Sequence, residues 1–402
     1  MQNSLSKLLV KFFFILQLII LNTTAFANEK PVNINPETPA QALGQYMEFL
    51  VDVPGALTFE AIQQEENWQQ VEGDSIIGGF TESVYWVRFT VQNTQELNQN
   101  WVLEVDYPII DFIELYQPSD TEQYTKTLAG DKYPFHQRPI KYHNIVFPIS
   151  SPANTKQTFY LKFKTESSMY IALNMLPKNT FPETMDEKLI VFGSIYGIIF
   201  LATIYCLINA VFLRERMYLF IAIGIFSSLG YSMSLNGFAF QYLWPNSLWL
   251  QSIAVPFFLN ICFGFALFYS REFLDLKKIT PRFDKTLIVL STFCLLVAVF
   301  SLFISYGTVI RISTVFAIIM SIAAFIAGVI SFFNGNKSAR YYLIGWMAIF
   351  IGAVTFALKS LGLIPSNLFT VWGQEFGFAC ISIFLTLAQS DHFFQAKKKH
   401  EA

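Results

Sequence analysis

Long apolar runs, separated by short polar loops, fill the second half of the chain. A helix needs about 20 apolar residues to cross the hydrocarbon core of a bilayer, where its backbone polar groups must bond to one another. Seven runs meet this requirement, at 190–213, 218–235, 247–270, 286–304, 312–333, 341–358 and 371–389. The pattern predicts an all-α domain of seven transmembrane helices over residues 188–392, followed by a short basic tail over 393–402.

The preceding segment, 28–187, shows the two-residue period of β-strands instead. In 159–164 the side chains of Phe159, Leu161 and Phe163 fall on one face and two lysines on the other. A short helix is expected near 39–49. Further strand patterns, separated by turn-forming residues, occur at 84–91, 101–106, 110–117, 144–150 and 170–176. Several short strands within about 160 residues predict an all-β antiparallel sandwich or jelly roll.

The first 27 residues have the pattern of a signal peptide. Lys7 and Lys11 precede an apolar stretch over 12–21, and Ala25 and Ala27 supply the small residues of a cleavage site. An uncleaved anchor is the alternative, but the apolar stretch is only about half as long as a bilayer-spanning helix. We expect cleavage after Ala27, which places the segment 28–187 outside the cytoplasm.

Charge is divided unequally between the two halves. Residues 28–187 contain 10 Lys and Arg against 22 Asp and Glu, a net charge of −12, whereas residues 188–402 contain 15 against 7, a net charge of +8. An acidic exported half is a poor partner for nucleic acid. The charged fraction of 14% also excludes an ordinary soluble enzyme, because soluble proteins carry about 25% charged residues.

Loop charges indicate the orientation in the membrane. The outer loops, 236–246, 305–308 and 361–370, contain no Lys or Arg. Twelve such residues lie in the loops and tail assigned to the inside: Arg214, Arg216, Arg271, Lys277, Lys278, Arg282, Lys285, Lys337, Arg340, Lys397, Lys398 and Lys399. Short loops rich in Lys and Arg stay in the cytoplasm. We therefore predict a multi-pass membrane protein with an exported N-terminal domain and a cytoplasmic C-terminus.

Cysteine and histidine give no signal for a metal or a disulfide. His136 and His143 lie seven residues apart in a loop-rich stretch, where two exposed histidines are more common than a metal-binding pair. The four cysteines lack zinc-ligand spacing and are expected to pack between helices, at Cys206, Cys262, Cys294 and Cys380. We expect no metal site and no cofactor.

Three ionisable side chains lie near the outer ends of the predicted spans: Arg311, Lys359 and Glu375. Charge inside a membrane is costly and usually faces a partner or a cavity, so these residues are candidates for coupling between helices. Arg311 and Lys359 have the alternative of extending to lipid headgroups. Glu375 is shorter, and we expect it inside the bundle, paired with Lys359 or Arg311.

A series of motifs resembles one family of bacterial receptors. The motifs are Ser83-Val84-Tyr85-Trp86-Val87-Arg88, Gly130-Asp131, Arg138-Pro139-Ile140, Tyr242-Leu243-Trp244-Pro245 and Arg271-Glu272-Phe273-Leu274. In this order they resemble the seven-transmembrane receptors with diverse intracellular signalling modules (7TMR-DISM), with the type-2 extracellular sensor domain, over roughly residues 55–392. The resemblance implies a periplasmic jelly-roll sensor that binds carbohydrate, a seven-helix transmitter in the inner membrane, and a homodimer. It also implies a cytoplasmic output module, commonly a cyclase, a kinase or a phosphatase.

The same resemblance is the main ground for expecting a ligand site in the exported domain. Trp86, Arg88, Asp131 and Arg138 combine an aromatic face with planar hydrogen-bonding groups, which together suit a sugar. The structural alternatives are that Trp86 belongs to the core and that Arg88 forms an ion pair with Asp131. Both interpretations stay open at the level of sequence.

The chain departs from the family at its C-terminal end. Ten residues follow Asp391-His392, so we expect a separate cytoplasmic protein to supply the output, unless the chain is truncated. The resulting interpretation is a receptor without enzymatic activity, which passes ligand binding through seven helices to that partner. The alternatives are a glycan-binding accessory or adhesion protein and a transporter. An intramembrane hydrolase would need converging acid and base residues, whereas the only histidines of the helical half are His392 and His400.

Overall fold

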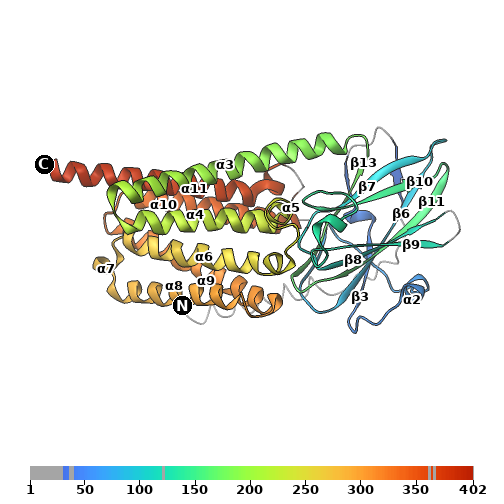
Figure 1. Ribbon diagram of the computed structural model, residues 1–402, viewed down its shortest axis with the longest axis horizontal. Coiled ribbons are helices and arrows are strands. Elements are labelled where there is room, and N and C mark those ends of the chain that lie inside the picture. Colours follow the sequence, from blue (N-terminus) through green and yellow to red (C-terminus); the bar gives the residue numbers. More distant parts are fainter. Residues whose placement is uncertain (1–29, 36–39, 120–122, 361–363, 365–367, 402) are drawn as a thin grey trace, which may run out of the picture.

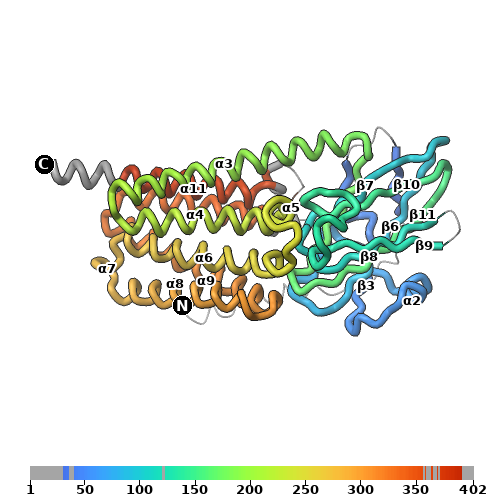
Figure 2. Tube along the Cα trace, viewed as in Figure 1, coloured from blue at the N-terminus to red at the C-terminus, as the bar shows by residue number. Residues whose placement is uncertain are grey.

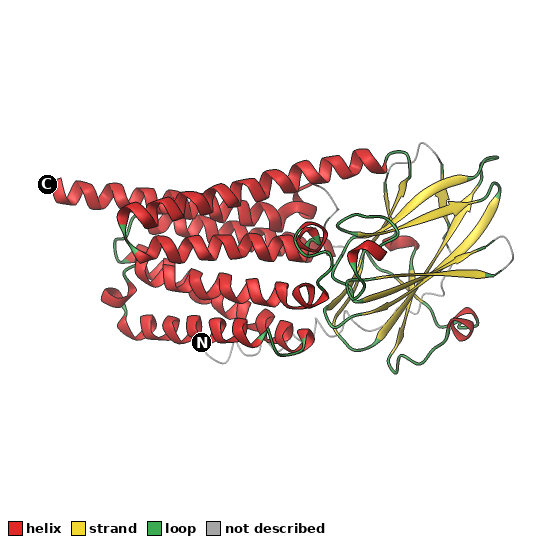
Figure 3. Ribbon diagram, viewed as in Figure 1, coloured by secondary structure: helices red, strands yellow, loops and turns green. Residues whose placement is uncertain are grey.

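The computed structural model describes residues 30–401 except 36–39, 120–122, 361–363 and 365–367. The predicted signal peptide, 1–27, lies outside these described residues. Strands and helices are segregated along the long axis of the molecule (Figures 1 and 3). A β domain from the first part of the chain lies at one end, and a bundle of helices forms the rest.

Two larger sheets and one pair of strands make up the β domain. The first sheet has the order β4-β3-β6-β11-β8-β9, with β1 parallel to β6; the second has the order β10-β7-β13-β2; and β12 pairs with β5. The strands are β1 (Val32–Ile34), β2 (Gln41–Ala42), β3 (Glu48–Asp52), β4 (Gln69–Gln70), β5 (Ile76–Phe80), β6 (Val84–Asn93), β7 (Gln99–Val105), β8 (Phe112–Pro118), β9 (Tyr124–Ala129), β10 (Ile145–Ser151), β11 (Thr155–Lys164), β12 (Ser168–Ile171) and β13 (Leu173–Pro177).

The main core lies between the two larger sheets. Alternate side chains of β6 and β11 form one side of it, and Phe89 stacks on its cross-strand partner Phe159 with ring centroids 5.4 Å apart. Trp101, Leu103 and Phe147 of the second sheet complete the same cluster. The predicted all-β sandwich is confirmed, and its apolar strand faces meet as the two-residue period requires.

The outer face of the first sheet is covered as well. The short helix α2 (Phe59–Gln63) packs on it through Ile62, next to Trp68 and Trp86. The backbone along β6 is therefore buried on both sides, which the alternation of polar and apolar residues did not indicate.

Two segments differ from the sequence-based expectations. The predicted strand 170–176 is divided, because the chain leaves β12 and joins the second sheet as β13 after Ala172. The helix expected near 39–49 is absent from residues 40–49. That stretch forms β2, one 3₁₀ turn (η1, Gly44–Tyr46) and the start of β3.

Seven long helices form the bundle within the described residues, in the places that the apolar runs predict. Successive helices run in alternating directions (Figure 2). They are α3 (Phe181–Leu213), α4 (Arg216–Leu235), α6 (Leu248–Phe273), α8 (Pro281–Phe300), α9 (Tyr306–Phe333), α10 (Ala339–Ser360) and α11 (Leu368–Glu401). By length and composition, five of them, α3, α4, α6, α8 and α9, are candidate membrane spans. The short helices α5 (Phe238–Tyr242) and α7 (Leu276–Ile279) lie at opposite ends of the bundle.

Close backbone approaches and hydrogen bonds between helices hold the bundle together, as in other membrane domains. A Cβ atom on Gly352 of α10 would lie 2.3 Å from the backbone oxygen of Gly373 on α11, so the two backbones can approach this closely only with glycine at position 352. Asn260 of α6 donates to Ser313 of α9 over 2.6 Å. Large apolar side chains such as Val211, Phe212 and Ile318 point outward, as they would toward lipid.

The sandwich joins the bundle through a very short connection. Strand β13 ends at Pro177 and helix α3 begins at Phe181. The Phe181 ring packs edge-on against Tyr142 of the sandwich, 5.5 Å between centroids. The first long helix is therefore fixed to the β domain at its outer end.

Candidate functional site

The loops at one end of the sandwich rest directly on the outer ends of the helices. The backbone N–H of Phe135 donates to the backbone oxygen of Pro245, in the connection between α5 and α6, over 3.1 Å. The backbone N–H of Gly307, at the start of α9, donates to the carboxylate of Glu166 over 3.3 Å. We call this contact region the junction.

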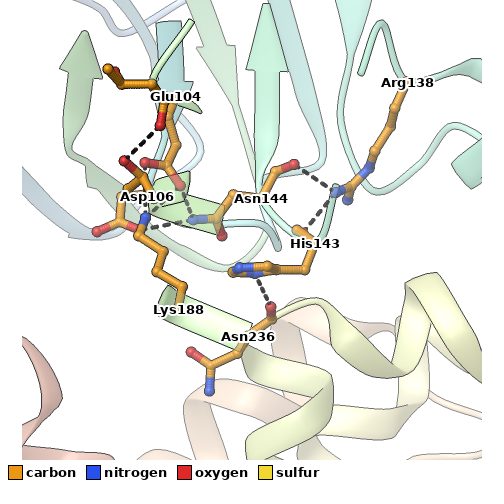
Figure 4. Close-up of polar contacts among 9 residues, drawn as sticks. Glu104, Asp106, Arg138, His143, Asn144, Lys188 and Asn236 are labelled. Carbon is orange, nitrogen blue, oxygen red and sulfur yellow. Dashed lines mark hydrogen bonds and ion pairs between the residues drawn. The ribbon is translucent and has the colours of Figure 1, made fainter. Parts of the chain in front are cut away.

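A buried ion pair crosses the junction (Figure 4). Glu104 is buried near the end of β7, and Lys188 of α3 donates to both of its carboxylate oxygens, over 2.7 and 2.9 Å. Asn144 adds hydrogen bonds to Glu104, 2.7 Å, and to Asp106, 2.8 Å. Burial alone would raise the pKa of Glu104, but the Lys188 charge and these hydrogen bonds lower that pKa overall. Glu104 is therefore ionised at neutral pH, and its counter-ion comes from the first helix.

His143 provides a second contact between the two domains. Its side chain is buried, with 2% of the residue exposed, and Nδ1 lies 2.9 Å from the backbone oxygen of Asn236 at the end of α4. The imidazole stacks on Phe238 of α5 with centroids 4.2 Å apart. Burial, and next the positive charge of Lys188, lower the pKa of His143 to about 3. The ring is neutral, and because a carbonyl only accepts, Nδ1 carries the proton.

Asn236 extends this contact to the last helix. Its side-chain amide donates to the Glu375 carboxylate of α11 over 2.8 Å, and Ser232 of α4 donates to the other carboxylate oxygen over 2.5 Å. Glu375 is 6% exposed. One residue, Asn236, thus connects a loop of the sandwich with two helices that are far apart in the sequence.

Arg138 and Asp131 support the loop that carries His143. The Arg138 guanidinium is buried and donates to the backbone oxygens of Tyr142, His143 and Asn144, over 2.9, 2.7 and 3.2 Å. Burial lowers the pKa of Arg138 to about 10, so it stays charged at neutral pH. Asp131 accepts a hydrogen bond of 3.3 Å from Gln251 of α6. Burial, with the nearby Asp111 charge, raises the pKa of Asp131.

A cavity of about 130 Å³ lies within the junction. Both domains contribute to its wall, and the wall contains ionisable and aromatic side chains. The lining residues are Asp106, Tyr107, Pro108, His143, Asn144, Tyr170, Lys188, Phe192, Leu235, Asn236, Trp372, Gln374 and Glu375.

The structure divides the residues that the sequence suggested for a ligand site. Trp86 is 0% exposed beneath α2, which matches the core alternative. Arg88 pairs with Glu48 over 2.6 Å and lies over Trp68, so the ion pair with Asp131 expected as an alternative is wrong. Asp131 and Arg138 lie at the junction, whereas Trp86 belongs to the separate apolar cluster beneath α2.

The remaining predicted residues are distributed as follows. His136 is exposed, but the expectation of an exposed His143 is wrong, because the junction encloses that ring. Arg311 is exposed on α9. The side chain of Lys359 lies outside the described residues, so the proposed pairing of Lys359 with Glu375 stays a prediction.

Four junction residues escaped the sequence analysis: Glu104, Asn144, Lys188 and Asn236. Glu104 had a recognisable signal, since it interrupts the apolar strand Val102–Val105, and Lys188 stands just before the first apolar run. An acidic residue inside a buried strand usually has a counter-ion. Nothing in the sequence indicated that these two residues would meet.

Comparisons with known proteins agree with this architecture. The family model described as "7TM diverse intracellular signalling" matches residues 188–392, which is more than half of the chain. A second model, "7TMR-DISM extracellular 2", matches residues 44–176. No curated protein matches the chain. A β domain seated on seven helices, matched in this order by both models, confirms the resemblance, and the chain belongs to the 7TMR-DISM family of membrane receptors with an extracellular sensor domain.

Proposed function

We propose that this protein is a receptor of the bacterial inner membrane whose periplasmic sandwich binds a polar, carbohydrate-like ligand. The helices pass the bound state to a separate cytoplasmic protein of the cyclase, kinase or phosphatase type. The observation that carries the proposal is the path from His143 through Asn236 to Glu375. This path supports a receptor because a movement of the sandwich loop would change the hydrogen bonding of α4 and α11 directly.

The chemistry of the junction favours signalling over simple attachment. Contacts made of hydrogen bonds and ion pairs can exchange between two discrete arrangements, as they do in known switching interfaces. A tethered, non-signalling binding domain would not need buried polar bonds to its anchor. Arg138 strengthens this argument, because it holds three successive carbonyls of the loop and so makes the loop move as a unit.

Hydrogen–deuterium exchange of the full chain in lipid nanodiscs tests the proposal. A panel of soluble glycans is added, and exchange is followed in the sandwich and at the outer ends of α4 and α11. We expect a binding glycan to change exchange in both places. A glycan that protects the sandwich and leaves both helix ends unchanged would identify a non-signalling accessory protein instead.

The orientation is tested separately with reporters fused after Ala402. The loop charges lead us to propose a cytoplasmic C-terminus. An alkaline phosphatase fusion should be inactive and a fluorescent protein fusion bright. An active phosphatase fusion and a dark fluorescent protein fusion would mean that the C-terminus lies outside the cytoplasm. Pairing of two copies, which the family resemblance implies, stays a prediction that cross-linking in membranes can check.

A further inference from the structure

We infer that a cavity inside the helical bundle is a binding site for a neutral amphiphile, a molecule with one apolar chain and a hydroxyl or carbonyl head. The cavity has a volume of about 270 Å³, and residues of α4, α6, α9, α10 and α11 line it. We call it the bundle cavity. It is separate from the ligand site proposed in the sandwich, and its test involves no glycan, so either site can fail without the other.

The bundle cavity is long and narrow. On α4 its lining runs from Ile221 to Tyr231, and on α11 it runs from Gln374 to Leu385. About ten residues of helix rise by about 15 Å. A volume of about 270 Å³ divided by this length leaves a cross-section of about 18 Å². Carbon atoms in contact lie about 4 Å apart, so a space of this width admits one extended chain.

The lining is mainly apolar and carries no charge. None of its described residues is Asp, Glu, Lys, Arg or His. The hydroxyls of Ser228, Thr314 and Ser382 donate to backbone oxygens of their own helices, over 2.7, 2.8 and 2.8 Å. Tyr269 and Trp346 contribute only their rings, because their polar atoms have almost no accessible surface. A charged group would lose its hydration here and find no counter-ion, so the occupant is neutral.

Two side chains at the outer end of the bundle cavity have unused hydrogen-bonding capacity. Tyr231 lies near the end of α4 and Gln374 near the start of α11, and both line the cavity. Their neighbours Ser232 and Glu375 are hydrogen-bonded, which places the two side chains at the same depth. Both side chains are half-buried, and neither makes a hydrogen bond within the described part of the chain.

These two side chains determine the chemistry of the head group. A tyrosine hydroxyl and a primary amide can each donate and accept a hydrogen bond. A hydroxyl or carbonyl head can bond to both of them, whereas a hydrocarbon leaves them without partners at a cost. Gln374 also lines the junction cavity, so a bound head would lie beside the contact of α4 with α11. An influence on signalling from this position, unlike the binding itself, rests on the proposed receptor function.

The bundle cavity is partly open at the outer part of α10. Ala353 belongs to its lining and is exposed. The adjacent Ile351 and Val354 are exposed apolar side chains, as expected of a surface that faces lipid. In the inner half, α9 and α10 are in contact, and the Tyr342 hydroxyl donates to the backbone oxygen of Ala324 over 3.1 Å. The occupant therefore reaches the site from the bilayer, where amphiphiles are concentrated.

Photolabelling of the full chain in phosphatidylcholine nanodiscs tests the site. The probe is an eight-carbon alkanol with a diazirine group in its chain, because the cavity volume corresponds to roughly nine water-sized groups. Mass spectrometry locates the adducts. We expect labelling of Phe263 and Phe378, in the lining, to saturate and to be displaced by 1-octanol. Labelling of the exposed Val211 and Phe212 should instead rise in proportion to the probe. Absent or non-saturating labelling of the lining overturns the proposal.

Competitors determine the class of head group without any mutation. 1-Octanol and 2-octanone, compared at equal mole fraction in the bilayer, should both displace the probe. Octane has no head and octyltrimethylammonium has a fixed charge, so each should be at least about tenfold weaker. A stronger effect of 1-octanol identifies a hydroxyl head, and a stronger effect of 2-octanone identifies a carbonyl head. Equal displacement by octane overturns the proposal, because any hydrocarbon chain, lipid tails included, would then fill the cavity.

Variants place the amphiphile in the bundle cavity. Tyr231→Phe combined with Gln374→Leu removes both polar contacts, so displacement by 1-octanol should weaken at least about tenfold. The weak displacement by octane should stay the same, which separates lost hydrogen bonds from a collapsed cavity. The matched controls are Tyr242→Phe and Gln64→Leu, at exposed residues outside the cavity, and they should change neither value. Ala266→Leu fills part of the cavity and should reduce the saturable labelling. Unchanged labelling and displacement in all these variants contradict the assignment.

Discussion

The sandwich core and the junction are both buried, but different forces hold them. In the core, apolar side chains of two sheets pack together, with Phe89 stacked on Phe159 as one example. In the junction, Glu104, Lys188, His143 and Asn236 make directional polar contacts. A close-packed apolar core interdigitates with few voids and resists rearrangement, whereas a buried polar network is stable only when its hydrogen-bonding partners are satisfied. The core therefore preserves the domain, and the junction is the region suited to change.

The largest effect should come from a cavity in the core. Phe159→Ala removes a fully buried ring and is expected to lower the free energy of unfolding of the sandwich by about 3–5 kcal/mol. Urea-dependent proteolysis of the full chain measures this loss. Leu97→Ala is the control, because Leu97 is 73% exposed and its loss should cost under about 0.5 kcal/mol. Similar losses for both would mean that the core is not the stabilising element.

Removing the counter-ion at the junction should have the next largest effect. Lys188→Met leaves Glu104 buried without its cation, at a cost of about 2–4 kcal/mol. The value is reduced because the Lys188 side chain is 21% exposed and water replaces part of the interaction. Thermal unfolding of the sandwich in the full chain measures it. Combining the change with Glu104→Gln should restore part of the lost stability. If the losses of the two single variants simply add in the double variant, the ion pair does not contribute to stability.

The pH dependence of the same variant has a definite sign. In the natural chain the pKa of Glu104 lies below its ordinary value of 4.5, so its stabilising contribution exists above that pH and is lost on acidification. Without Lys188, burial raises the pKa of Glu104, and stability should fall as pH rises from about 4.5 to 7. Lys188 also lowers the pKa of His143. Its removal lets this pKa rise in the folded state, so the stability difference between the natural chain and the variant again grows as pH rises. Parallel curves for the two proteins would disprove this account.

A double-mutant cycle tests the connection between sandwich and helices. Asn236→Ala removes the donor of their shared hydrogen bond and Glu375→Ala removes its acceptor, and the coupling energy between the two changes should be about 1–2 kcal/mol. Thermal unfolding of the bundle gives the four values. A cycle between Asn236 and Glu166 is the control, since no hydrogen bond or ion pair joins these two described residues, and it should show additivity. Additivity in both cycles would contradict the proposed path from His143 through Asn236 to Glu375.

The smallest effect is expected at Arg311. This residue is exposed on α9, so Arg311→Gln should change the free energy of unfolding by no more than about 0.5 kcal/mol. The measurement is the same thermal unfolding experiment in nanodiscs. A loss of about 2 kcal/mol or more would mean that Arg311 forms a stabilising ion pair and has the coupling role first suggested for it.

The elements that were predictable depend on local patterns. A helix that crosses a membrane needs only its own apolar length, so the seven helices follow from the sequence. Strands β6 and β11 are visible because their faces alternate, but α2 is five residues long and has no comparable pattern. The sequence therefore did not indicate that α2 covers the outer face of the first sheet. For this reason Trp86, which lies on that face, remained a candidate for ligand binding.

The junction could not be predicted because its partners are brought together by tertiary structure alone. His143 and Asn236 are 93 residues apart, and Asn236 and Glu375 are 139 apart. Only the docking of the sandwich on the helices sets these distances. The search for charges inside the spans did find Glu375, since an intramembrane carboxylate is conspicuous, but its neutral partners Ser232 and Asn236 are ordinary residues in a helical sequence.

The short connection between β13 and α3 has a mechanical consequence. Helix α3 has 33 residues and is therefore a rod about 50 Å long, fixed to the sandwich at Phe181 and Lys188. Only three residues separate the strand from the helix, so a rotation of the sheet must also move the start of the helix. If the sheet leans by about 5°, the far end of such a rod swings by about 4 Å. The helix acts as a lever that converts a small tilt on one side of the membrane into a displacement as large as a side chain on the other.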